Sequence, residues 1–364
     1  MAEIIRRWCS SEKEKYSPDL IDKLDEYENE LLPIARKNKN RKGKKIPSTM
    51  IINHFTKSYP RPKVLLGPYK LEYLTGNTPN GKLRIYNLHD YHRHITKKNK
   101  EHMFASEWIL ETLKNSDVFI DVFLEYDIPF KGHNLKKRPS WYYNQGELTK
   151  TIGILEDCMI HKKGCPTPNS RVHGADVRKR QEIISEFEKI IRRNKGEKLT
   201  KSTVKSLREY IHNILQTKKI KKQFINTPDC IRNEIFNIID NRFLEELEKI
   251  KHISSDEILE DTGAIIGSSI GVILMDAYLL GRLFRKFDIR PSDKGMSENI
   301  QNVIIYAGGE HSEFYTKVLQ KCGFKLKYSV GVTGKTIDYA LQKGELIKYM
   351  TLDISNIPYP LFRD

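Results

Sequence analysis

The chain has 364 residues, of which 38% are hydrophobic and 10% aromatic, so it predicts a compact protein with a sizeable core and excludes a disordered polymer. Lysine and arginine outnumber aspartate and glutamate by 63 to 47, a formal net charge of +16. Such a charge favours nucleic acid or another polyanion as a partner. Solvated surface helices in a lysine-rich chain give the same excess, and both interpretations stay open.

The start of the chain and its apolar segments bear on location. The first residues, MAEIIRRWCSSEKEKY, lack the apolar core of a signal peptide. No stretch reaches the roughly 18 to 20 uninterrupted apolar residues of a membrane span. The nearest candidate, Ala264 to Leu283, is interrupted by polar residues that include Asp276 and Arg282, so we expect a buried helix there. We therefore expect a soluble intracellular protein without a membrane span.

The five cysteines form no dense framework, so we expect no obligatory disulfide scaffold and a reducing compartment. Cys158 and Cys165 bracket His161 in CMIHKKGC, which can be interpreted as part of a metal site. A structural zinc site needs a fourth ligand at defined spacing, and no such partner motif appears. We favour a structural role for this segment.

Periodicity divides the chain into four segments. An amphipathic helix over 17–37 and a basic arm precede three short strand patterns, over 63–67, 69–75 and 82–88, and the turn GNTPNG makes the last two a hairpin. A helix over 101–114 and a strand over 118–124 then predict a βαβ unit with a right-handed crossover. Basic helical patterns follow, then an apolar helix, a strand over 302–307, a helix over 311–321 and a strand over 324–331. We predict an α/β fold with a mixed, largely parallel central sheet flanked by helices and a basic helical insertion, divided as 1–62, 63–174, 175–255 and 256–364.

Ionisable side chains follow three of these strands at the point where each strand ends. The strand over 82–88 runs into HDYHRH, which contains Asp90, His92 and His94, and the strand over 118–124 runs into Glu125. The late strand runs into Gly308-Gly309-Glu310-His311. Because ligands of α/β proteins bind beyond the carboxyl ends of parallel strands, we expect one site to gather these groups.

The residue types at these strand ends suit two kinds of chemistry. Asp90, His92 and His94 alternate, so on a continuing strand they face one side and offer a divalent metal its oxygen and nitrogen ligands. An aspartate and a histidine also form an acid–base pair. An exposed polar turn explains HDYHRH equally well. Around His311, the two glycines and a helix N-terminus can stabilise negative charge, or they can form only a tight turn.

Arg171 lies in the segment NSRVHGADVR, which comes after Glu125 and before the strand over 302–307 in the sequence. An arginine can clamp a carboxylate or phosphate with two parallel hydrogen bonds. Taken alone, the segment is more typical of a salt-bridged helix entrance.

Six motifs together resemble a protein group encoded by large nucleocytoplasmic DNA viruses. They span roughly residues 67 to 320 and read GPYKLEYL, LRIYNLHDYHRH, VFIDVFLEYD, CPTPNSRVHGADVR, LMDAYLLGRLFR and NVIIYAGGEHSEFY. The same skeleton is similar, more distantly, to the hydrolase superfamily that includes TraB, Tiki, ChaN and erythromycin-esterase-like proteins. There, one strand ends in Gly-Glu-x-His, a later strand ends in Glu, an Arg follows, and a late strand ends in Gly-x-x-His.

The resemblance implies a hydrolase-like site at the strand ends. Asp90 and His92 match the first acid and histidine, Glu125 the second acid, Arg171 the arginine, and Gly308 with His311 the last motif. This chain departs from the pattern at Leu88-His89, where the family has its glycine, and at Asp90, which replaces a glutamate.

We therefore expect a metal-dependent or acid–base hydrolase-like site. Asp90, His92, Glu125, Arg171 and His311 are the expected catalytic residues, and Asp90, His92, His94, Glu125 and His311 are the expected ligands of a divalent metal. The alternative is a catalytically inactive virion or scaffold protein that binds nucleic acid, virion proteins or other partners through its basic surface. Either function implies the host cytoplasm or the virion.

Overall fold

The computed structural model describes residues 63–93, 95, 102–127, 145–160, 167, 169–176, 188–193, 200–216, 226–237, 241, 271–289, 296–357, 361 and 362. These residues belong to the second of two compact units, Pro62–Asp364. The expected helix over 17–37, the basic arm and much of the expected insertion lie outside the described residues.

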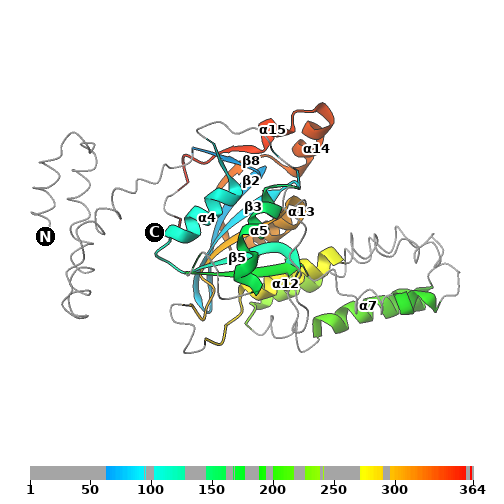
Figure 1. Ribbon diagram of the computed structural model, residues 1–364. Helices are drawn as coiled ribbons and strands as arrows, with labels where there is room; N and C mark the ends of the chain where they lie inside the picture. The colour runs from blue at the N-terminus through cyan, green and yellow to red at the C-terminus, as the bar shows by residue number, and fades with distance from the viewer. Residues whose placement is uncertain are drawn as a thin grey trace, which may run out of the picture. The chain divides into compact units, whose positions relative to one another are not determined.

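A six-stranded mixed sheet forms the centre of the described fold (Figure 1). Its order is β6-β5-β7-β3-β2-β8, with β6 (Ser170–Asp176), β5 (Ile120–Asp127), β7 (Asn302–Gly308), β3 (Gly81–Asp90), β2 (Lys70–Thr78) and β8 (Lys325–Gly331). The four strands from β6 to β3 are parallel, whereas β2 is antiparallel to both of its neighbours. The predicted α/β class, with a mixed and largely parallel sheet, is confirmed.

A smaller sheet, β4-β1-β9, stands beside the central one. It consists of β4 (His102–Phe104), β1 (Val64–Leu66) and β9 (Thr351–Asp353). Strand β1 pairs with β4 in parallel and with β9 antiparallel. The segment after β3 thus re-enters a sheet before helix α4 (Ala105–Asn115) begins.

Helices cover both faces of the central sheet. Helices α4 and α5 (Glu147–Ile160) share one hydrophobic cluster with Tyr86, Leu88 and Tyr306 of the sheet. Helices α12 (Gly271–Leu283) and α13 (Gly309–Lys321) share another cluster with Ile85 and other residues of the opposite face. Further helices among the described residues include α7 (Lys201–Gln216), α14 (Gly334–Lys343) and α15 (Leu346–Tyr349).

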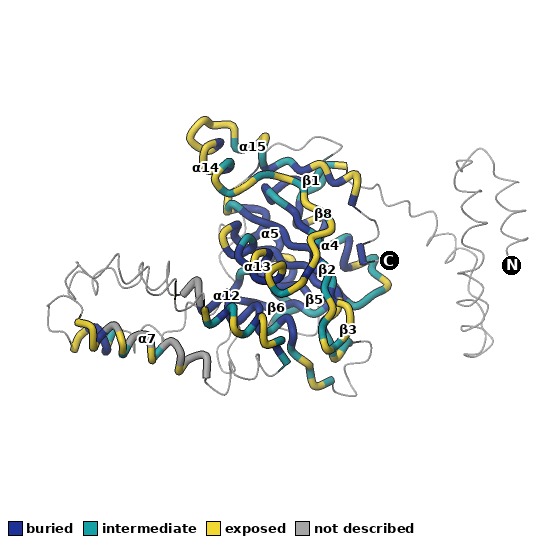
Figure 2. The backbone as a smooth tube through the Cα atoms, turned by 180° about the vertical axis from the view of Figure 1, so that it is seen from behind, coloured by how far each residue is buried: buried dark blue, intermediate teal, exposed yellow. Residues whose placement is uncertain are grey.

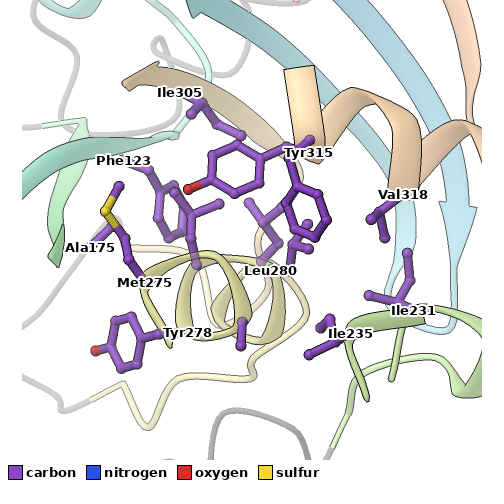
Figure 3. Close-up of a cluster of buried hydrophobic side chains, with 14 of the residues drawn as sticks. Phe123, Ala175, Ile231, Ile235, Met275, Tyr278, Leu280, Ile305, Tyr315 and Val318 are labelled. Atoms are coloured by element: carbon purple, nitrogen blue, oxygen red, sulfur yellow. The ribbon is translucent and has the colours of Figure 1, made fainter. Parts of the chain in front are cut away.

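Strand composition follows from this layering. All seven residues of β7 are buried, because a parallel strand covered on both faces has no solvent side. Figure 3 shows the core on one side, where Met275 and Leu280 of α12 point toward Phe123 of β5, Ile305 of β7 and Tyr315 of α13. In Figure 2 the central strands are largely buried, whereas α14 is mostly exposed. The apolar area removed from water by these two clusters is the main stabilising contribution to the fold.

Three features differ from the sequence-based expectations or were not anticipated. Strand β7, which follows α12 in the sequence, lies between β3 and β5, so the two strands of the predicted βαβ unit do not pair with each other. The segment around Arg171 is the edge strand β6, not a helix entrance. Cys230 and Cys322 form a disulfide across 92 positions of sequence, which joins the helix over 229–237 to the end of α13.

The connections leave β3 and β7 toward opposite faces of the sheet. The chain after β3 reaches α4 in one cluster, whereas β7 leads directly into α13 in the other. Adjacent parallel strands whose connections diverge leave a crevice beyond their carboxyl ends, where ligands of open α/β sheets bind. The fold therefore points to the ends of β3, β7 and β5 as the candidate functional site.

Candidate functional site

The carboxyl ends of three neighbouring strands bring the acidic residues together. Asp90 ends β3 and lies in register with Gly308, which ends β7. On the other side of β7, Leu124 of β5 pairs with Tyr306, so Glu125 comes one residue nearer to the site. Asp90 follows the sheet face that carries α4, whereas Glu125 follows the face that carries α12 and α13. The two side chains therefore come from opposite faces of the sheet, at the carboxyl ends of its parallel strands.

Glu125 lies between two histidines, and each histidine approaches a different carboxylate oxygen. His92 Nε2 is 3.6 Å from Glu125 Oε2, and His311 Nε2 is 3.6 Å from Glu125 Oε1. The backbone N–H of Gly308 donates to Glu125 Oε2 at 2.7 Å. With a side chain 9% exposed, the carboxylate is held by main chain at the site's centre.

His92 is held from behind by Asp90. Asp90 Oδ2 accepts the His92 backbone N–H at 2.7 Å and lies 3.2 Å from His92 Nδ1. His92 has a φ of 53°, in the left-handed region, so β3 has ended and its alternation does not extend to His92. The contact from an aspartate to the backbone two residues later stabilises such a turn. The His92 side chain is 53% exposed and faces the solvent side of the site.

His311 is held from behind by Asp276, a residue of α12. The distance from His311 Nδ1 to Asp276 Oδ1 is 2.6 Å, and the two side chains are only 7% and 2% exposed. A carboxylate on Nδ1 fixes the imidazole tautomer and leaves Nε2 directed to the reacting side. The two histidines thus have the same arrangement, but one is buried and the other is open to water.

Two glycines allow the backbone to approach this group closely. A Cβ on Gly308 would lie 2.8 Å from His92 Nε2 and 3.1 Å from Glu125 Oε2. A Cβ on Gly309 would lie 1.8 Å from the hydroxyl oxygen of Tyr69. The close approach at Gly308 and Gly309 therefore involves side chains from β5 and from the segments after β3 and before β2.

Charge balance limits what the site can hold. Three carboxylates, those of Asp90, Glu125 and Asp276, surround the two imidazoles. With both imidazoles neutral and protonated on Nδ1, each Nε2 presents a lone pair to Glu125, which is unfavourable unless a proton or cation lies between them. A proton or a cation between a ring Nε2 and Glu125 would remove this repulsion.

The residue types at the site are suitable ligands for a transition metal, but their side chains are not arranged as a complete coordination shell. Histidine nitrogens with carboxylates on Nδ1, together with Glu125, are typical zinc or manganese ligands. Two ligands of one tetrahedral zinc lie roughly 3.4 Å apart, close to the separations across Glu125. Among the described residues, however, no group of three or more His, Cys, Asp or Glu side chains is positioned to hold a metal ion.

Arg171 is not brought to this site. Its guanidinium forms two hydrogen bonds with Asp121, at 2.7 and 3.2 Å, and a third with the carbonyl of Ser297. Arg171 pairs with Asp121 four residues before Glu125, which is about 13 Å along the strand. The structure places the Arg171 guanidinium in a network with Asp121 that joins β5 to β6, and its expected role as an anion-binding residue stays a prediction.

The HDYHRH motif contains two further histidines, His89 and His94. His94 lies outside the described residues. His89 faces α13 and its Nε2 is 3.0 Å from Glu72, which also accepts from Thr316 and pairs with Lys70. Burial alone would raise the pKa of Glu72, but hydrogen bonds from His89, Lys70 and Thr316, with the charge of His89, hold it at about 2. This buried network anchors α13 on the sheet and does not enter the site.

Sequence reasoning missed Asp276 and Tyr306 as members of the site. The signal for Asp276 was present, because an acid in the middle of an otherwise apolar helix needs a partner. Tyr306 gave no such signal, since a tyrosine in an apolar strand is an ordinary core residue. Its hydroxyl donates to Asp90 Oδ1 at 2.8 Å.

The fold and site thus define a mixed α/β protein with two carboxylate-backed histidines at its parallel strand ends. Comparison of this chain with protein-family models, curated proteins and solved structures finds no match. Among the described residues, no helix has the length and apolar character needed to cross a membrane.

Proposed function

We propose that the chain is a hydrolase whose site at the strand ends works by acid–base chemistry. One observation carries this proposal: two histidines, each backed by an aspartate, face the opposite oxygens of Glu125. A core needs no such arrangement, because burying charged and imidazole groups costs free energy unless each is paired. The resemblance to the TraB, Tiki, ChaN and erythromycin-esterase-like superfamily supports the same reaction class.

His311 and His92 have different roles in this reaction. His311, buried and held by Asp276, removes a proton from water through Nε2. The water oxygen forms a bond to an electrophilic carbon or phosphorus of the substrate, and the bond to the leaving group breaks. His92, exposed and held by Asp90, enters as the imidazolium and gives its Nε2 proton to the leaving group. Glu125, between them, stabilises whichever imidazole is positively charged.

A metal-dependent form of the same site is the second candidate, favoured by the donor set. His92, His311 and Glu125 would hold the ion, with Asp90 and Asp276 fixing the two imidazoles from behind. Such an ion lowers the pKa of a bound water toward about 7.

The test uses the full-length chain and a panel of chromogenic substrates. The panel contains a p-nitrophenyl acetate, a phosphate monoester and a phosphate diester, and each is assayed before and after chelation. His311→Ala, His92→Ala and Glu125→Gln remove the proposed base, the proposed acid and the central carboxylate. His102→Ala, on β4 of the smaller sheet, is the matched control for loss of a histidine. Elemental mass spectrometry measures the metal content of every sample.

The outcomes separate the candidates. Acid–base chemistry predicts hydrolysis that survives chelation and falls by roughly 10²- to 10⁴-fold in His311→Ala, with His102→Ala unchanged. Stoichiometric metal that is lost in His92→Ala and His311→Ala, with activity that needs it, supports the metal-dependent form.

Hydrolysis of no substrate, with no metal bound, would favour the alternative of a virion or scaffold protein that uses its net charge of +16. Affinity for DNA or RNA that falls steeply with salt supports that alternative, because each phosphate contact releases counterions.

A further inference from the structure

Tyr306 connects the buried core to the exposed half of the site. It is the fifth residue of β7, fully buried, and its hydroxyl donates to Asp90 Oδ1 at 2.8 Å. We infer that Tyr306 is a positioning residue, which sets the orientation of the Asp90 carboxylate and, through it, the tautomer and direction of the His92 imidazole. This inference rests on the proposed function for the role of His92 in a reaction, but the contacts themselves do not depend on it.

The two oxygens of Asp90 have separate partners. Oδ1 receives the Tyr306 hydroxyl, whereas Oδ2 receives the His92 backbone N–H and lies beside His92 Nδ1. A carboxylate held at one oxygen only can rotate about its terminal torsion, which is soft and broad. With Tyr306 in place, Oδ2 stays where it can accept from both groups of His92. The phenol therefore fixes the carboxylate that fixes the histidine.

His92 needs this support more than His311 does. His92 combines a left-handed backbone with a side chain that is 53% exposed. His311 is 7% exposed and begins a long helix that is docked on the sheet. Tyr306 donates to Asp90, the carboxylate that holds His92, so loss of its hydroxyl should affect His92 more than His311.

The surroundings of the phenol keep it a hydrogen-bond donor. Burial, together with the charges of Asp90 and Glu147, raises the pKa of Tyr306 well above its ordinary value, so the hydroxyl keeps its proton. A Cβ on Gly67 would lie 3.2 Å from the hydroxyl oxygen, so backbone closes the space on that side. The hydroxyl hydrogen is directed toward Asp90 Oδ1.

The experiment measures the His92 tautomer by ¹⁵N NMR of the full-length chain labelled on histidine. The ring nitrogen shifts are recorded above the pH at which the imidazole titrates, and His92→Gln assigns the His92 signals. Tyr306→Phe removes the donor. Tyr126→Phe is the matched control, because Tyr126 is a buried tyrosine that donates to another buried carboxylate, Glu156, at 2.6 Å.

In the wild type and in Tyr126→Phe, we expect His92 to be protonated mainly on Nδ1. In Tyr306→Phe, we expect the ratio of the Nδ1–H to the Nε2–H tautomer to fall at least twofold, with the His311 signals unchanged. Tyr306→4-aminophenylalanine retains an N–H donor at the same position and should restore the wild-type ratio. Tyr306→4-fluorophenylalanine, which fills the ring's volume without a donor, gives the same comparison if Tyr306→Phe does not fold.

An unchanged His92 ratio in the variants without a donor, or an equal change in Tyr126→Phe, would overturn the inference. The readout does not need a substrate, so it is independent of the hydrolase proposal. If the tautomer shifts but the wild type hydrolyses nothing, the positioning role stands and the proposed function fails. If hydrolysis is found and the tautomer does not shift, the positioning role fails alone.

Discussion

The buried imidazole of His173 makes stability depend on pH in a direction that can be calculated. His173 stacks on Phe123 and Phe287, donates from Nε2 to Asp121 at 2.8 Å, and accepts from Arg282 at Nδ1. Burial first, and then the charge of Arg282, lower its pKa from 6.5 to about 3, despite the hydrogen bond to Asp121. The native protein thus keeps this imidazole neutral where the unfolded chain binds a proton.

The sign and size follow from proton linkage. Between pH 6.5 and about 3 the unfolded state binds one more proton at His173 than the folded state, so stability falls as pH falls. The slope is about 1.4 kcal/mol per pH unit, and the 1.5 units from pH 6.5 to pH 5 correspond to a loss of about 2 kcal/mol. Above pH 6.5 this contribution is fully present and constant.

His173→Gln tests this calculation, because the amide retains polar groups but does not titrate. The free energy of unfolding is measured from urea titrations of both proteins between pH 8 and pH 5. The variant is expected to be less stable at pH 8, and the difference between the two curves should shrink by about 2 kcal/mol by pH 5. His89, whose pKa burial also lowers, contributes alike to both proteins and cancels. Parallel curves over the whole range would refute the reasoning.

Three further changes probe the close approaches around the site. Gly308→Ala places a methyl carbon 2.8 Å from His92 Nε2, and the exposed imidazole ring is expected to move aside. We expect the rate of hydrolysis to fall at least tenfold, whereas a thermal melt should show a loss of stability below about 1 kcal/mol. Gly309→Ala drives a Cβ into the buried Tyr69 ring and should cost about 3 kcal/mol or more in a urea titration, with part recovered when Tyr69→Ala is added; additive losses would contradict the clash. Cys230→Ser opens a disulfide that closes 92 positions of chain, and a loss of about 2–4 kcal/mol is expected in the same titration.

Much of the sheet was predictable because its signals are local. The hairpin of β2 and β3 follows from two β-forming runs around a Gly-Asn-Thr-Pro-Asn-Gly turn, and β7, α13 and β8 follow from an apolar run, a helical period and Gly323 as a stop. The segment at Arg171 was not predicted as a strand. Its mixture of Arg, His and Asp contradicts the apolar pattern of a buried strand, and only the Asp121 network in the folded state makes it acceptable.

The sequence by itself determined the residue types at the strand ends: Asp90 and His92 after one strand, Glu125 in another, and His311 after Gly308. Alternation and turn chemistry act within a few residues of chain, so they place each group at the end of its own strand. The order of the strands depends on contacts between distant segments, and the tertiary structure alone put β7 between β3 and β5. That order turns Glu125 toward both histidines.

The same distinction explains the supporting residues. Asp276 reaches His311 from 35 positions away and Tyr306 reaches Asp90 from 216 positions away. Contacts between residues so far apart in the sequence produce no periodicity or motif spacing that could predict them. Both pairs exist because the packing of α12, α13 and the two sheet faces buries these groups, and a buried polar group is stable only where the fold supplies its partner.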